Sequence, residues 1–135
     1  MLFHSTRGND SGKDFATVLM QGLADDGGLF MPDHWPQVDL EAIKSKTSFI
    51  DVAKCIVPLF TASSFSHAET IKIVEDTWHD FEHADLVGIQ TFDDVSILEL
   101  FHGPTAAFKD FGLQLAAAFF NEVLESENKT AIVLG

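Results

Sequence analysis

The 135-residue sequence is short of several residue types: it has a single cysteine, no tyrosine and a single arginine. Cys55 alone can form neither an intrachain disulfide nor a cysteine-rich zinc site, which fits a reducing cytoplasm. Eight basic side chains stand against 21 acidic ones, for a net charge of −13. This balance argues against nucleic acid or an anionic membrane surface as a partner.

Long apolar runs and targeting signals are also missing. No stretch approaches the ~20 apolar residues that a membrane-spanning helix needs, and the N-terminus lacks a basic start followed by an apolar run. We therefore expect a soluble cytoplasmic protein with no membrane partner. There is also no Gly-x-Gly-x-x-Gly, no Walker loop and no serine nucleophile elbow.

What the chain does have is core material, since 46% of its residues are hydrophobic and 13 are phenylalanines. Apolar spacing and capping signals predict four main helices and several short strands. The predicted helices span residues 15–24 (capped by Asp14), 48–60 (capped by Ser48), 66–81 (a Ser66–Glu69 capping box) and 106–125. The predicted strands span residues 29–32, 87–92 and 96–101, with a turn at Asp93-Asp94, and a buried parallel strand "AIVLG" is predicted at 131–135.

These elements predict an α/β fold in two parts. Residues 1–90 form an α-rich mixed N-terminal domain, and residues 91–135 form the first β-α-β part of a second domain. A two-strand start of a parallel sheet buries little by itself. We therefore expect the sequence to be the front part of a longer protein.

Lys109 is the first candidate for chemistry, because it lies between Phe108 and Phe111 at the head of a greasy helix. Positions four, seven and eleven further on are apolar, so helical geometry predicts that the lysine lies on a buried apolar stripe. Burial and the positive end of the helix dipole both disfavour a protonated amine. A neutral amine is a nucleophile for carbonyl groups. Asp110 is interpreted as an acid on a wet edge that complements the dipole, without a catalytic role.

The stretch "STRG" at residues 5–8 is the second candidate. The planar five-donor guanidinium of Arg7, flanked by the hydroxyls of Ser5 and Thr6, suits a phosphate or a carboxylate. From these four residues alone, a surface turn that contains an arginine is the simpler interpretation.

The third candidate is "HDFEH" at residues 79–83, which fits the H-x-x-E-H spacing of some zinc peptidases. The pattern is loose, and six histidines make a chance pair at this spacing easy to obtain. A further metal ligand is also needed and is not obvious in the sequence. The preferred interpretation therefore includes no metal.

Three motifs together resemble the N-terminal portion of threonine synthase. They are "STRG" at 5–8, "GLADDGGLFMP" at 22–32 and "LELFHGPTAAFKDFGLQL" at 98–115, and their order and spacing agree with that family. Two departures are Phe3, where the family often has tyrosine, and Ala106, where a larger residue is common. Neither change affects Lys109.

The resemblance implies a pyridoxal-phosphate enzyme, a carbon–oxygen lyase, of the tryptophan-synthase-like fold (fold type II). It implies that Lys109 binds the cofactor through a Schiff base and acts as base and acid on O-phospho-L-homoserine, the small-molecule substrate. Phosphate then leaves, and water adds to give L-threonine, in the last step of threonine biosynthesis. It gives Arg7 and Thr6 a role in substrate binding. The segments that hold the cofactor phosphate and ring lie beyond residue 135, so these residues alone are expected to be nearly inactive without the C-terminal part.

Three alternatives stay open beside this one. A phosphate-eliminating lyase derived from threonine synthase would share the lysine and its helix but release a keto acid. A non-catalytic packing or interaction domain would show no cofactor absorbance in the full-length protein. A zinc peptidase would hold stoichiometric metal. The "STRG" and "DGGLFMP" motifs argue against a threonine dehydratase or a cysteine synthase.

Overall fold

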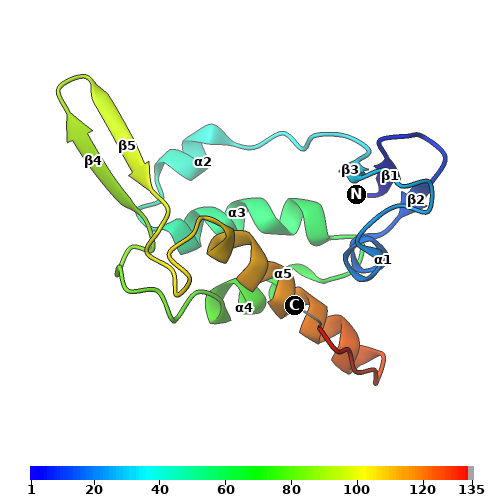
Figure 1. Ribbon diagram of the computed structural model, residues 1–135. Coiled ribbons are helices and arrows are strands. Elements are labelled where there is room, and N and C mark those ends of the chain that lie inside the picture. The colour runs from blue at the N-terminus through cyan, green and yellow to red at the C-terminus, as the bar shows by residue number, and fades with distance from the viewer. Residues whose placement is uncertain (134–135) are drawn as a thin grey trace.

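The computed structural model describes residues 1–133, and residues 134–135 lie outside the description. Five helices and five strands are present in the described range (Figure 1). In chain order they are β1 (Phe3–Ser5), β2 (Ser11–Lys13), α1 (Phe15–Gln21), β3 (Phe30–Pro32), α2 (Leu40–Lys44), α3 (Phe49–Thr61), α4 (His67–Asp76), β4 (Gly88–Phe92), β5 (Val95–Glu99) and α5 (Lys109–Ser126).

The N-terminal strands form a small antiparallel sheet in the order β2-β1-β3. Helix α1 follows β2, and the carboxylate of Asp14 caps it by accepting a hydrogen bond from the Thr17 backbone N–H at 2.8 Å. The helix ends at Gln21, three residues before the predicted end, because Gly22 adopts a positive φ of 74° and terminates it. The strand predicted at 29–32 is confirmed as β3.

Helices α3 and α4 begin where their capping residues predicted. Ser48 caps α3 by accepting from the Asp51 N–H, and Ser66 and Glu69 form a complete capping box on α4. Helix α4 ends at Asp76, five residues before the predicted end. The chain turns there because Trp78 takes a positive φ of 65° and its indole is buried, with only 3% of its surface exposed.

Helix α5 joins the two halves of the core. Its inward face packs Phe111 and Leu115 against the cluster around Trp78 and Val74. One and two turns further on, Phe119 (1% exposed) and Val123 are buried as well. Phe119 meets the N-terminal aromatic side chains, with its ring centroid 5.2 Å from that of Phe15. One face of α5 therefore runs along the whole core. The helix crosses the other helices obliquely (Figure 1).

Strands β4 and β5 pair as an antiparallel hairpin that extends away from the helices (Figure 1). Both strands and the turn at Asp93-Asp94 are where the sequence predicted them. Large apolar side chains on both faces are more than half exposed: Ile89, Phe92, Val95, Ile97 and Leu98. An isolated two-stranded hairpin is marginally stable in water, so little within residues 1–133 holds this one in place.

The parallel strand predicted at 131–135 is not confirmed. Residues 131–133 form no strand and are exposed, and the last two predicted positions lie outside the described residues. The strand pairs of the described range are all antiparallel, so a β-α-β unit is absent from residues 1–133. A parallel strand needs a neighbouring strand to pair with, and no strand within residues 1–133 pairs with residues 131–133. Within the same range, no helix is long and apolar enough to cross a membrane.

Candidate functional site

Lys109 is the first residue of α5, and its side chain is exposed. It borders a shallow hollow with Phe108, Gly112 and Leu113, and the two apolar side chains are 65% and 64% exposed. The predicted burial of Lys109 is therefore wrong for the described part of the chain. The apolar stripe on which it lies is present: Lys109 and Leu113 at its start are exposed, whereas Ala116 and Phe120 are half-buried and border a hollow with Leu19 of α1. Helix α5 uses the neighbouring stripe, through Phe111 and Phe119, to contact the core.

Asp110, predicted on a wet edge, is instead buried with 4% of its surface exposed. Its carboxylate accepts hydrogen bonds from the backbone N–H of Thr105 at 2.9 Å and from the Thr105 hydroxyl at 2.8 Å. The backbone of Gly103 packs directly on the carboxylate, so a side chain at position 103 would collide with it.

The "STRG" and "DDGG" motifs meet at one side chain, that of Asp26. Its carboxylate accepts from the Ser5 hydroxyl at 2.6 Å, from the Gly28 N–H at 2.9 Å and from the Asn9 N–H at 3.1 Å. These hydrogen bonds, that of Ser5 foremost, hold the pKa of Asp26 below its ordinary value, and Arg7 adds a smaller electrostatic contribution. Asp26 therefore ties two loops together that are about twenty residues apart in sequence. Sequence reasoning assigned it no role.

Thr6 and Arg7 are both engaged in this junction. The Thr6 hydroxyl accepts from the Leu29 N–H at 3.0 Å, and Nη1 of Arg7 donates to the backbone carbonyl of Asp26 at 3.0 Å. Of the two glycines that follow, Gly27 has the positive φ expected of this turn, at 76°, and Gly28 does not. Gly28 is needed for another reason: a side chain there would collide with the Ser5 hydroxyl.

The structure does not bring the two predicted groups together within residues 1–133. Thr6 and Arg7 belong to the loop between β1 and β2, at the same end of the molecule as α1. Lys109 opens α5, near the α3 and α4 helices (Figure 1). Lys109 borders the apolar hollow described above.

A histidine–carboxylate pair lies in the segment that leads to Lys109. Nε2 of His102 is 2.8 Å from Oε2 of Glu99, and both side chains are about four-fifths buried. The His83 ring packs beside that of His102, with centroids 4.7 Å apart. This pair connects the end of β5 to the "HGPT" loop. Its signal in the sequence is the i,i+3 spacing of an acid and a histidine.

The zinc-peptidase alternative needs His79 and His83 on a helix, and the structure places neither residue on one. Residues 79–83 lie beyond the end of α4, so His79 and His83 are not one helical turn apart. His79 instead contacts the Asp76 carbonyl, and His83 accepts from the Asp85 N–H. Within the described residues, no group of three or more histidine, cysteine, aspartate or glutamate side chains is placed to hold a metal ion.

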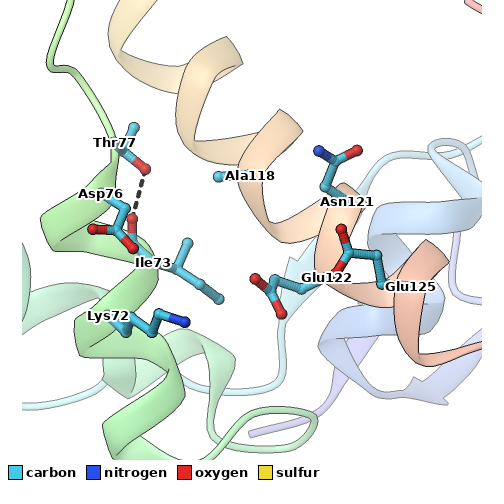
Figure 2. Close-up of a pocket in the computed structure, with 8 residues that line it drawn as sticks. All are labelled: Lys72, Ile73, Asp76, Thr77, Ala118, Asn121, Glu122 and Glu125. Atoms are coloured by element: carbon cyan, nitrogen blue, oxygen red, sulfur yellow. Dashed lines mark hydrogen bonds between the residues drawn. The ribbon is translucent and has the colours of Figure 1, made fainter.

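A separate hollow lies between α4 and α5 (Figure 2). Lys72 of α4 and Glu122 of α5 point toward one another across it, and Asp76 and Glu125 also line it. The Thr77 hydroxyl is already bonded to the Ile73 carbonyl at 2.7 Å. Three carboxylates against one ammonium disfavour an anionic substrate at this position. The hollow therefore does not compete with the Lys109 surface as a place for phosphate chemistry.

Comparison with known proteins identifies the class to which this architecture belongs. The family described as "Threonine synthase N terminus" matches residues 2–78. Threonine synthase of Pseudomonas aeruginosa is 37% identical over 138 aligned residues, which cover all of this chain and 29% of that protein. "Threonine synthase-like 2" of Xenopus laevis is 35% identical, over 99% of this chain and 29% of that protein.

A solved structure gives the same result. The crystal structure of pyridoxal-phosphate-bound threonine synthase from Brucella melitensis superposes with a TM-score of 0.87 at 36% identity, over 95% of this chain and 28% of that one. The chain thus has the N-terminal α/β fold of a pyridoxal-phosphate-dependent enzyme. It belongs to the threonine synthase N-terminus family, which confirms the resemblance of its three motifs. It spans under a third of the length of the relatives it matches.

Proposed function

We propose that the full-length protein containing this chain is a threonine synthase, a pyridoxal-phosphate-dependent lyase that converts O-phospho-L-homoserine and water to L-threonine and phosphate. The observation that supports this most directly is the position of Lys109. Its exposed amine borders an apolar hollow, inside the motif "LFHGPTAAFKDFGLQL", in a chain that is 36% identical to a pyridoxal-phosphate-bound threonine synthase.

The residues around Lys109 fit the cofactor. A primary amine is the group that condenses with an aldehyde, and the apolar walls at Phe108 and Leu113 suit an aromatic ring. When bound, pyridoxal phosphate supplies an electron sink for negative charge that develops at the substrate Cα. We propose that Lys109 binds the cofactor, and that its amine, once released by the substrate amine, moves protons at Cα and Cβ.

Arg7 and Thr6 are proposed to contribute to substrate binding. Arg7 uses Nη1 for the Asp26 carbonyl, and it is the only arginine of an acidic chain. Its charge could therefore attract the substrate's phosphate or carboxylate, while Thr6 fixes the loop through Leu29. In full-length enzyme, Arg7→Ala should raise KM for phosphohomoserine with less effect on kcat, and Arg7→Lys should lie between. An unchanged KM in both variants would show that Arg7 does not contribute to substrate binding.

The test of the cofactor assignment is chemical. Full-length protein with pyridoxal phosphate should absorb near ~420 nm, lose the band on borohydride reduction and retain the label on the Lys109 peptide. Lys109→Ala should abolish label and turnover. Lys46→Ala, which removes an exposed lysine after α2, is the matched control and should leave both unchanged. Absence of the band would favour a non-catalytic domain.

A second function remains in competition, because the chain is also similar to a protein named threonine synthase-like 2. A phosphate-eliminating lyase would use the same lysine and release phosphate together with a keto acid. Analysis of products after complete turnover separates the two, since only the synthase gives one threonine per phosphate.

We also propose that residues 1–135 alone show almost no turnover, and that the domain boundary falls near residue 90. Limited proteolysis of the full-length protein tests the domain boundary. We also propose a cytoplasmic location, which cell fractionation tests.

A further inference from the structure

Helix α5 begins in an unusual way for a helix whose first residue is a candidate catalytic lysine. Phe108 occupies the N-cap position and makes no capping hydrogen bond with its side chain. Instead of a capping residue in the loop, a residue inside the helix restrains the preceding loop: Asp110, in the first turn. The Asp110 carboxylate accepts both the N–H and the hydroxyl of Thr105, at 2.9 and 2.8 Å.

The loop between Gly103 and Phe108 needs such a restraint. Ala106 has a positive φ of 53°, which a residue with a Cβ adopts only when its surroundings impose it. The Ala106 N–H donates to the Gly103 carbonyl at 2.9 Å, and the Gly103 backbone packs on the Asp110 carboxylate. The carboxylate therefore contacts Gly103 and Thr105, the residue at the start of this turn and the one directly before the strained Ala106.

The same contact sets the rotation of the helix. Successive residues in a helix are about 100° apart around its axis, so a residue buried at position 110 determines which way its neighbour points. Asp110 is 4% exposed, and Phe111 packs into the core on the adjoining face. Lys109 is consequently turned outward, to the apolar hollow bordered by Phe108 and Leu113.

We propose that Asp110 is a positioning residue for Lys109. It fixes the Gly103–Phe108 loop and the first turn of α5, so that the lysine amine is presented in one direction. The inference rests on the proposed function, in which that amine bonds to the cofactor's aldehyde carbon. Orientation matters in such a step because a flexible lysine stem on a loose helix end rarely reaches the reactive geometry.

The experiment uses full-length apoenzyme, four variants of the Asp110–Thr105 contact and one control variant. Asp110→Ala removes both acceptor atoms, and Asp110→Asn keeps the shape and one acceptor. Thr105→Val removes the hydroxyl donor, and Thr105→Ser restores it. Glu122→Gln is the matched control, because it neutralises an exposed acid three turns further along the same helix. Two quantities are measured: amide hydrogen exchange across residues 103–111 in apoenzyme, and the rate of pyridoxal phosphate attachment per folded molecule.

Asp110→Ala should speed exchange at Ala106 and slow cofactor attachment, each by about tenfold or more, because hydrogen bonds to a charged acceptor are lost. Asp110→Asn and Thr105→Val should show smaller changes. Thr105→Ser and Glu122→Gln should match the parent protein. A role confined to overall stability would lower the folded fraction and leave the attachment rate per folded molecule unchanged.

The outcomes separate the two proposals. If borohydride labels Lys109 in the parent protein, and Asp110→Ala attaches the cofactor at the parental rate, the positioning role is refuted and the proposed function stands. If the parent protein is labelled at another lysine, both are refuted. Slow attachment in Asp110→Ala, with recovery in Asp110→Asn, supports the positioning role.

Discussion

The indole Nε1 of Trp78 donates a hydrogen bond to the backbone carbonyl of Phe111 at 3.0 Å, across 33 residues of sequence. The same ring meets Phe49 of α3 nearly at a right angle, with centroids 5.0 Å apart. Trp78 thus connects the end of the α4 segment to the first turn of α5 and to α3. The rotation of the helix that begins with Lys109 is therefore fixed from the core as well as from its own loop.

Replacement of Trp78 by phenylalanine should loosen this connection. The ring stays apolar, but the hydrogen bond is lost and the Phe111 carbonyl loses its indole partner, which costs about 1 kcal/mol. Amide hydrogen exchange in full-length protein should show the first turn of α5 opening more often, with α1 unaffected. Trp35→Phe is the control, because Trp35 is 66% exposed. Equal exchange in the two variants would contradict the role of the indole N–H.

The Asp26 junction predicts a pH dependence. The folded-state pKa of Asp26 is lowered, mainly by the Ser5 hydroxyl, so its contribution to stability is present above the ordinary carboxyl pKa of 3.8. That contribution is lost as the pH falls through the lower, folded-state value. Protection of the Asn9 and Gly28 amides, corrected for the intrinsic pH dependence of exchange, should therefore fall at acid pH in the parent protein. In Asp26→Asn this acid-dependent loss of protection should be absent at the same two amides.

The lack of space at Gly28 predicts a larger effect. Gly28→Ala would place a methyl group against the Ser5 hydroxyl, so the buried Ser5 side chain and its hydrogen bond to Asp26 must shift. Overpacking of this kind costs about 1–3 kcal/mol. The expected result is a lower Tm together with a higher KM for substrate, since the Arg7 loop moves with Ser5. A Tm close to the parent value would show that the Asp26 junction accommodates the added methyl group without a cost in stability.

The buried pair Thr61 and Thr70 provides a test of a different kind. Their hydroxyls are 2.9 Å apart, and each residue is at most 1% exposed. Thr61→Val leaves the buried Thr70 hydroxyl without this partner and should cost about 1–3 kcal/mol of stability. Thr70→Val should cost less, because the Thr61 hydroxyl also donates to the Val57 carbonyl at 3.4 Å. The double variant should cost less than the sum, because the unpaired Thr70 hydroxyl is gone. Strict additivity in thermal or urea unfolding would mean that the two hydroxyls act independently.

Local signals in the sequence predicted much of the fold. Asp14, Ser48 and Ser66 cap the helices expected of them, because capping depends on residues only three positions apart. The hairpin turn at Asp93-Asp94 is equally local. The predicted end of α4 was wrong because Trp78 lies outside the helix with its indole buried. This is a tertiary effect that local sequence patterns do not reveal.

The candidate site was less predictable for a related reason. Lys109 was selected from its place between phenylalanines at a helix start, and its position on an apolar stripe was correct. Its burial was wrong because apolar spacing does not say which of two adjacent stripes meets the core: α5 buries Phe111 and Phe119 and leaves Leu113 in solvent. The roles of Asp110 and Asp26 were missed because each carboxylate accepts hydrogen bonds from a loop whose path only the structure reveals.

The exposed hairpin has a consequence for the biogenesis of a full-length family member. Strands β4 and β5 have open edges and apolar side chains on both faces, and the relatives continue well beyond the segment matched here. As such a chain leaves the ribosome, its N-terminal helices can already pack around Trp78 while Ile97 and Phe92 still lack a covering layer. Unpaired edges of this kind attract other strands. We therefore expect a nascent chain to be prone to association through this hairpin until a covering layer forms.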